Sequence, residues 1–146
     1  MAVAAFRNYI LPRGGAVRFA ALRLRLLDGK IREPDLLLLR DARDPRRQNR
    51  YWTGADLVLE VVSEDKPGRD LIEKRQEYAQ AGTPEYWIVN SLDRSLTVLA
   101  LDERGEYAEH GVFTRGMKAT SALFPDFSVD VARVFDADIL ADTDAE

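Results

Sequence analysis

Near its middle the chain reads Ala55-Asp-Leu-Val-Leu-Glu-Val-Val-Ser63, an apolar run bounded on both sides by loop residues. Such a run is typical of a central strand that is buried on both faces. Residues 70–81 predict a helix, because this segment is rich in strong helix formers and is followed by Gly82. The segment Glu85-Tyr-Trp-Ile-Val-Asn90 predicts a second strand. The short connections between strand, helix and strand indicate a crossover between two parallel strands.

Further strands are predicted on both sides of this unit. Residues 16–27 alternate between leucine and arginine near their end, which indicates a strand with one solvated face before the turn at Asp28-Gly29. The next strand is expected over residues 31–39, with Pro34 at an edge or irregular point, because proline cannot donate to a ladder. The other predicted elements are a short helix at 4–11, a hairpin of 95–101 and 107–113, a short strand within 123–131 and a helical turn at 131–135. The fold class is therefore α/β.

Length and composition predict one domain. A chain of 146 residues is long enough for one hydrophobic core and short for two. We expect a single domain over residues 1–146, in which 1–15 hold the remnant of a helix and 138–146 form a frayed acidic tail. No apolar run approaches the roughly 20 residues that cross a bilayer, and no signal peptide is recognisable. A cytoplasmic protein without membrane contact is the expectation.

The available residue types restrict the chemistry. The chain has no cysteine and one histidine, His110, which excludes disulfides, thiolate zinc sites, cysteine nucleophiles and multi-histidine metal sites. The net charge of −4 argues against a protein that coats nucleic acid through its overall charge. Local basic patches can still exist on a protein with this net charge. Carboxylates, lysine and hydroxyl groups are left, together with a metal that prefers oxygen ligands.

Two charged residues occupy positions where apolar residues are expected. Glu60 lies inside the apolar run, where an unpaired charge would be costly or would shift its pKa. A nearby cation would resolve this conflict, and the alternative is an outward-facing position on an edge strand. Lys74 shares a helical stripe with Leu71, Tyr78 and Ala81, all of them facing the predicted core. Its amine either serves a buried partner or reaches back to water.

Asp35 becomes a candidate metal ligand when it is considered together with Glu60 and Lys74. It follows Pro34 at the entry to four leucines, and two carboxylates on neighbouring strands can hold Mg²⁺ or Mn²⁺. Lys74 beside Asp35 and Glu60 would stabilise developing negative charge or help to activate a water. These three residue types around one metal are sufficient for phosphodiester hydrolysis. Secondary candidates on the same segments are Glu33, Ser63, Asp70 and Tyr78.

Four motifs taken together resemble a known family. They are Pro34-Asp35, Asp56-Leu-Val-Leu-Glu60-Val-Val-Ser63, Arg69-Asp70-x-x-x-Lys74-x-x-x-Tyr78-Ala-x-Ala-Gly82 and Glu85-Tyr-Trp-Ile-Val89. Their order and spacing resemble the Uma-two restriction endonuclease family of the PD-(D/E)XK nuclease superfamily, over roughly residues 16–135. The resemblance implies a restriction-endonuclease-like fold, with a mixed sheet flanked by helices. It also implies that this chain is shortened at its N-terminus, since family members carry a longer region there.

The resemblance assigns roles to the three residues. Asp35 and Glu60 would be the ligands of Mg²⁺ or Mn²⁺. The superfamily pattern has a lysine two residues after the second acid, where this chain has Val62. The family is expected to carry that lysine on the following helix, which fits Lys74. Because small nucleases often pair, the resemblance also implies a homodimer.

Three functions are compatible with the sequence. The first is a Mg²⁺-dependent endonuclease acting on DNA, and the second is a catalytically inactive nuclease-fold module for binding or assembly. The third is a hydrolase with Ser63 as nucleophile and Lys74 as base, although no Gly-x-Ser-x-Gly signature is present. The polar loop of residues 40–54 could contact DNA phosphates or simply be solvated. Its candidate DNA-binding residues are Arg43, Arg46, Arg47 and Arg50.

Overall fold

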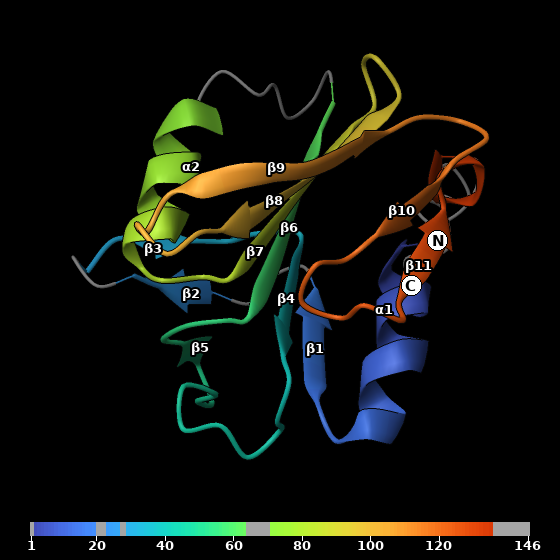
Figure 1. Ribbon diagram of the computed structural model, residues 1–146. Coiled ribbons are helices and arrows are strands. Elements are labelled where there is room, and N and C mark those ends of the chain that lie inside the picture. The colour runs from blue at the N-terminus through green and yellow to red at the C-terminus, as the bar shows by residue number, and fades with distance from the viewer. Residues whose placement is uncertain (1, 20–22, 27–28, 64–70, 136–146) are drawn as a thin grey trace.

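The computed structural model describes residues 2–19, 23–26, 29–63 and 71–135 (Figure 1). Its elements are α1 (Ala2–Ile10), the 3-10 helix η1 (Leu11–Arg13), β1 (Ala16–Phe19), β2 (Arg23–Arg25), β3 (Ile31–Arg32), β4 (Leu36–Leu39), β5 (Tyr51–Trp52), β6 (Leu57–Val62), α2 (Leu71–Gln80), β7 (Glu85–Asn90), β8 (Ser95–Leu101), β9 (Tyr107–Phe113), β10 (Lys118–Thr120) and β11 (Ser128–Asp130). Residues 131–135 are helical and follow β11 directly.

A six-stranded mixed sheet organises the protein, with the strand order β1-β4-β6-β7-β8-β9. Strands β6 and β7 are parallel, and every other neighbouring pair in this sheet is antiparallel. Helix α2 lies between β6 and β7 in the chain, which confirms the predicted strand, helix and strand unit. The predicted strands at 85–90, 95–101 and 107–113 match β7, β8 and β9.

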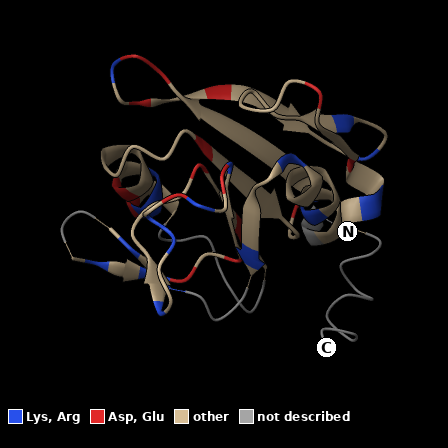
Figure 2. Ribbon diagram, turned by 90° about the horizontal axis from the view of Figure 1, so that it is seen from below, with Lys and Arg blue, Asp and Glu red and all other residues tan. Residues whose placement is uncertain are grey.

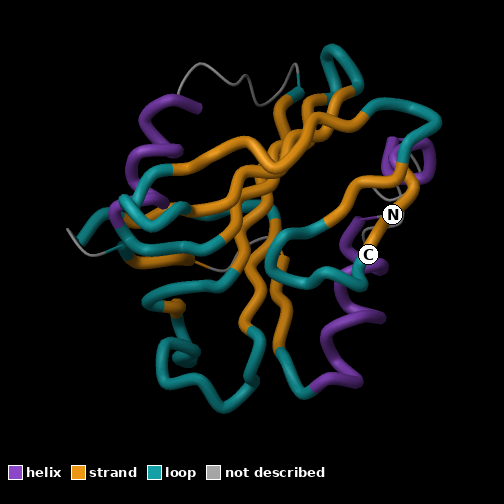
Figure 3. Tube along the Cα trace, viewed as in Figure 1, coloured by secondary structure: helices purple, strands orange, loops and turns teal. Residues whose placement is uncertain are grey.

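Both faces of the central strands are buried, as the apolar run of residues 55–63 predicts. In β6, Leu57 and Leu59 pack into a core cluster with Phe6 of α1, whereas Val58 packs into the opposite cluster with Tyr78 of α2. This alternation follows from the two-residue period of a strand. Figures 1 and 3 show α1 and α2 on opposite sides of the sheet. The face toward α2 is the one that carries Glu60.

The predicted strands on the N-terminal side are each divided in two. The single strand predicted over 16–27 is wrong, because β1 pairs with β4 in the main sheet while β2 pairs with β3 and β5 in a separate three-stranded sheet. The strand predicted over 31–39 is also divided, into β3 and β4. Pro34 lies in the break, where its missing N–H and its fixed φ interrupt the ladder.

The remaining differences concern short elements. Helix α1 begins at Ala2 rather than at residue 4 and ends one residue earlier than predicted, β5 lies within the loop predicted over 40–54, and β11 covers only part of the segment 123–131. The acidic tail predicted to fray lies outside the described residues. In the part of the chain that the structure describes, no helix is long and apolar enough to cross a membrane.

Candidate active site

Asp35 and Glu60 face each other at one end of the β4–β6 pair. The antiparallel register pairs Leu36 with Leu59, so its continuation by one residue places Asp35 opposite Glu60. Residues directly opposite in an antiparallel pair project from the same face, with Cβ atoms about 5 Å apart. The Asp35 Oδ2 atom also accepts a hydrogen bond of 2.7 Å from the backbone N–H of Val61. The carboxylate of Asp35 is thereby attached to the strand that carries Glu60.

Glu60 is buried, with 6% of its surface exposed. The hydroxyl of Tyr78 donates a hydrogen bond of 2.7 Å to its Oε2 atom, and the Lys74 amine lies 3.5 Å from its Oε1 atom. Burial raises the pKa of Glu60, and the nearby charge of Asp35 raises it further, while the Tyr78 hydrogen bond and the Lys74 charge lower it in part. The net pKa shift is upward, so one ammonium group does not compensate fully for the cost of the buried charge.

Helix α2 supplies the two side chains that cover Glu60. Lys74 and Tyr78 are four residues apart, so they lie on the same face of the helix, one turn apart. Tyr78 is fully buried, and the Lys74 side chain is 21% exposed. Burial beside the Glu60 carboxylate raises the pKa of the Tyr78 phenol, which therefore stays protonated and serves as a donor. Of the stripe predicted to face the core, Tyr78 is buried in it and Ala81 packs against it, while Leu71 and Lys74 are half-buried. The Lys74 amine points to the buried acid.

The donor set fits a divalent cation that prefers oxygen. Two like charges share one face, and the ionised form of Glu60 is disfavoured where it lies. A Mg²⁺ or Mn²⁺ ion would relieve both effects, and it tolerates a site in which water completes the coordination. Among the described residues, no group of three or more His, Asp or Glu side chains gathers at one point. The described part of the chain therefore offers two carboxylates, Asp35 and Glu60, to such an ion.

The sequence matches the Uma2 family, described as "Putative restriction endonuclease", over residues 2–132. The chain belongs to the Uma2 family. A crystal structure described as that of a "putative nuclease" from Anabaena variabilis ATCC 29413 has a similar fold, with a TM-score of 0.72 and 17% sequence identity. The match covers 92% of this chain and 76% of that chain. Comparison with curated proteins gives no match. The predicted family and the restriction-endonuclease-like fold class are thus confirmed.

The secondary candidates differ in their distance from the Asp35–Glu60 pair. Tyr78 contacts Glu60 directly, whereas Glu33 is 56% exposed and pairs with Arg23 at 3.5 Å. Ser63 is half-buried and follows β6, and Asp70 lies outside the described residues. Val62, at the position where the superfamily pattern has lysine, is buried. Among the residues that the structure describes, Lys74 is the lysine whose amine approaches Glu60, at 3.5 Å.

The arginine-rich loop of residues 40–54, or arginine loop, lies at the end of the β4–β6 pair opposite to Asp35 and Glu60. Arg46 binds Asp44 at 2.8 Å and Asp56 at 2.9 Å, which fixes it within the loop. Asp56 precedes Glu60 by four strand residues, or about 13 Å along β6. Arg43 and Arg50 are exposed, and Arg47 donates to a backbone carbonyl of the loop. Basic and acidic segments are interspersed over the protein (Figure 2), and DNA contact by this loop stays a prediction.

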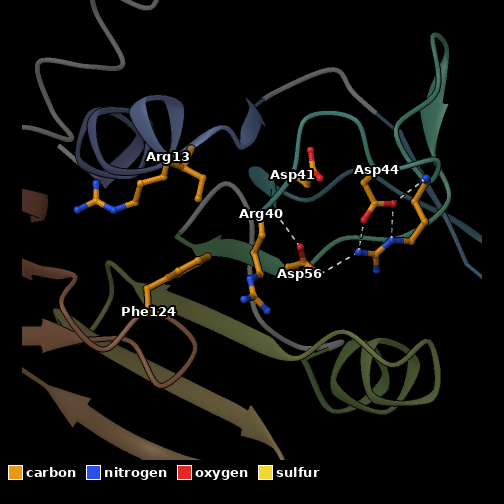
Figure 4. Close-up of a pocket in the computed structure, with 8 residues that line it drawn as sticks. Arg13, Arg40, Asp41, Asp44, Asp56 and Phe124 are labelled. Carbon is orange, nitrogen blue, oxygen red and sulfur yellow. Dashed lines mark hydrogen bonds and ion pairs between the residues drawn. The ribbon is translucent and has the colours of Figure 1, made fainter.

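A groove of about 570 Å³ borders the same loop (Figure 4). Arginine and aspartate residues line most of it, together with Ile10 and Phe124. Figure 4 shows the Arg40 side chain extending into this space beside Asp56, whose Oδ2 atom accepts the Arg40 backbone N–H. Because its arginines and aspartates are equal in number, three of each, the groove has no strong preference for an anion. Neither Asp35 nor Glu60 lines this groove.

Two further buried carboxylates were not identified from the sequence. Glu77 of α2 is 7% exposed and binds Arg32 and Lys30. Its partners lie more than forty residues away in the chain, so no local pattern points to it. Glu85 is fully buried and accepts four hydrogen bonds, from the Trp87 indole, the Ser121 hydroxyl and two backbone N–H groups. An acidic residue at the start of an apolar strand is the same kind of signal that identified Glu60.

Proposed function

We propose that this Uma2 protein is a metal-dependent endonuclease that hydrolyses phosphodiester bonds of DNA. One observation carries the proposal: Asp35 and Glu60 face each other on neighbouring strands, and the amine of Lys74 lies 3.5 Å from the buried acid. Membership of the Uma2 family, described as "Putative restriction endonuclease", supports the same reaction class. DNA is the substrate that this family description favours.

In this proposal Asp35 and Glu60 hold Mg²⁺ or Mn²⁺. When bound, the ion supplies positive charge to the phosphate oxygens and favours ionisation of the attacking water. Lys74 stabilises the negative charge that develops on the phosphate in the transition state. Tyr78 fixes the Glu60 carboxylate by its hydrogen bond. The Val61 N–H fixes Asp35 in the same way, so both acids are oriented before substrate arrives.

The exposed arginines of the loop extend this proposal to DNA binding. Arg43 and Arg50 would contact backbone phosphates, while Arg46 and Arg47 hold the loop in shape through the contacts described above. A homodimer and a cytoplasmic location belong to the same proposal. Light scattering at several protein concentrations tests the dimer.

Cleavage of supercoiled plasmid DNA in Mg²⁺ or Mn²⁺ tests the proposed function. We expect wild-type protein to convert the plasmid to open-circular and linear forms, and chelation of the metal to stop the reaction. Lys74→Ala and Glu60→Gln should lose cleavage. Lys118→Ala, which changes an exposed lysine of β10, is the matched control and should cleave normally. Absence of cleavage by wild type, or equal cleavage by Lys74→Ala, contradicts the proposal.

A non-catalytic binding module is the second candidate. The pairing of Arg46 with two aspartates favours it, because the loop then offers less positive charge to DNA than its sequence indicates. Such a module would show no Mn²⁺ uptake that depends on Glu60. The Ser63 hydrolase receives less support, since the amine of Lys74 lies against the Glu60 carboxylate.

A further inference from the structure

Glu77 forms the most extensive ion-pair cluster around α2. Its Oε1 atom accepts a hydrogen bond of 2.7 Å from Arg32 Nε, and its Oε2 atom accepts one of 2.9 Å from Arg32 Nη2. Lys30 Nζ donates a third, of 3.0 Å, to Oε2. A bidentate arginine–carboxylate pair constrains both side chains in orientation as well as in distance. These contacts join the segment before β4 to the helix that covers the site.

The contacts of Glu73 with the same two cations are much weaker. Glu73 lies one turn earlier on α2, is 58% exposed, and approaches Arg32 at 3.7 Å and Lys30 at 3.9 Å. An exposed pair at such distances contributes little to stability. The Glu77 side chain is 7% exposed, and Arg32 and Lys30 lower its pKa to about 2. The buried acid, not the exposed one, therefore fixes the geometry of the cluster.

The position of the cluster relates it to the candidate active site. Arg32 is the last residue of β3 and precedes Asp35 by three residues, with Pro34 limiting the freedom of the intervening backbone. Glu77 follows Lys74 by three residues and immediately precedes Tyr78. One ion pair thus connects the segment that carries the first acid with the helix that carries the amine and the phenol.

We propose that Glu77 and Arg32 form a positioning clamp, which holds α2 against the Asp35 segment and thereby sets the placement of Lys74 and Tyr78 over the two carboxylates. This inference rests on the proposed function for its catalytic consequence. The clamp residues do not touch the reacting atoms. They act through Asp35 on one side and through Lys74 and Tyr78 on the other.

The amide of Val61 reports on the clamp without DNA or metal, because it donates to the Asp35 carboxylate. We would measure its hydrogen exchange and chemical shift by NMR in wild type and in Glu77→Gln. The expected result is at least tenfold faster exchange of the Val61 amide, with the amides of β7 unchanged. Glu73→Gln is the matched control, since it removes an exposed acid that touches the same cations, and it should leave Val61 as in wild type.

Plasmid cleavage supplies the second readout. Glu77→Gln should lower kcat about tenfold with little change in KM. The reason is that Glu77 is buried and acts on the reaction only through the placement of Lys74 and Tyr78. Arg32→Lys keeps the charge and loses the bidentate geometry, so it should give a smaller change in the same direction, and it decides the question if Glu77→Gln does not fold. Val61 exchange at the wild-type rate in a folded clamp variant overturns the clamp. A responsive Val61 amide in a protein that cleaves no DNA supports the clamp and overturns the proposed function alone.

Discussion

Two buried glutamates, Glu77 within α2 and Glu60 on the strand beside it, differ in the positive charge that surrounds them. Glu77 accepts three short hydrogen bonds from Arg32 and Lys30, and its pKa falls to about 2. Glu60 has one ammonium group at 3.5 Å, a neutral phenol and a second acid nearby, and its pKa rises. The first carboxylate is fully compensated by the protein. The second is left short of positive charge.

This difference separates an acid that holds the structure together from an acid that is available for chemistry. A buried carboxylate that is paired with cations has its charge compensated by the protein, so the removal of either partner is costly. A buried carboxylate without a matched cation costs stability, and such costs are typical of sites that bind a charged ligand. Glu60 is an acid of the second kind, because its pKa is raised by burial.

The largest effect is expected on cleavage. Glu60→Gln should reduce the rate about 10²–10³-fold, the range typical for loss of one key electrostatic group. The same substitution should not lower thermal stability at neutral pH, because glutamine keeps an acceptor for Tyr78 and removes an incompletely compensated charge. Plasmid cleavage and calorimetric melting on one preparation test both parts. A variant that cleaves normally, or that unfolds far below wild type, would contradict this assignment of Glu60.

The next effect is expected on stability, with Glu77→Gln. We expect a loss of roughly 2–4 kcal/mol in the free energy of unfolding, because breaking a buried ion pair leaves its partners without their acceptor. Glu73→Gln should change it by less than about 1 kcal/mol. Urea denaturation of the two variants measures the difference. Equal losses would show that burial does not distinguish these two acids.

The pH dependence of stability should have opposite signs at the two acids. Unfolded Glu77 binds a proton near its ordinary pKa of 4.5 and the folded one only near 2, so its stabilisation is present above pH 4.5 and is lost as the pH falls toward 2. The raised pKa of Glu60 contributes stability at low pH that is lost as the pH rises through the folded value.

Melting curves of each Gln variant against wild type, recorded from pH 2.5 to 7, separate the two contributions. The difference between Glu77→Gln and wild type should shrink as the pH falls. The difference between Glu60→Gln and wild type should move in favour of the variant as the pH rises. Parallel pH profiles for the two variants would contradict the difference in charge compensation between Glu60 and Glu77.

The smallest effect is expected in the arginine loop. Arg43→Ala changes a side chain that is 91% exposed, so stability should be unchanged, whereas DNA affinity should fall uniformly and its salt dependence should weaken by about one unit of slope. Arg46→Ala should instead cost about 1 kcal/mol of stability, because it removes hydrogen bonds to Asp44 and Asp56. Fluorescence anisotropy at several salt concentrations and melting curves measure the two quantities. If Arg46→Ala lowered the DNA affinity and Arg43→Ala did not, the DNA contact would belong to Arg46 and not to Arg43.

Local patterns were sufficient to predict the centre of the fold. The apolar run of β6, the helix formers of α2 and the strand β7 are adjacent in sequence and in the sheet, so each element could be recognised from its own residues. The strand predicted over 16–27 is wrong because β1 and β2, which both lie within it, pair in different sheets, and the alternation near its end does not reveal this. Periodicity shows which face a residue takes. It does not show which strand becomes its neighbour.

The candidate site divides in the same way. Glu60 and Lys74 were identified because each is a charge at a position that its own element buries, and the structure brings them together. Glu85 carries the same signal and was overlooked. Glu77 could not be found from the sequence, since its burial depends on Arg32 and Lys30 of a distant hairpin, and an acid on a helix is ordinarily solvated.

Calorimetric titration of Mn²⁺ into the purified protein decides whether the Asp35–Glu60 pair binds a metal ion. Wild type should bind one ion, and Asp35→Asn and Glu60→Gln should each abolish or weaken that binding at least tenfold. Glu73→Gln, which changes an exposed acid of the same helix, should bind as wild type does. Equal Mn²⁺ binding by wild type and Glu60→Gln, or no binding by either protein, would contradict a metal centre at the Asp35–Glu60 pair.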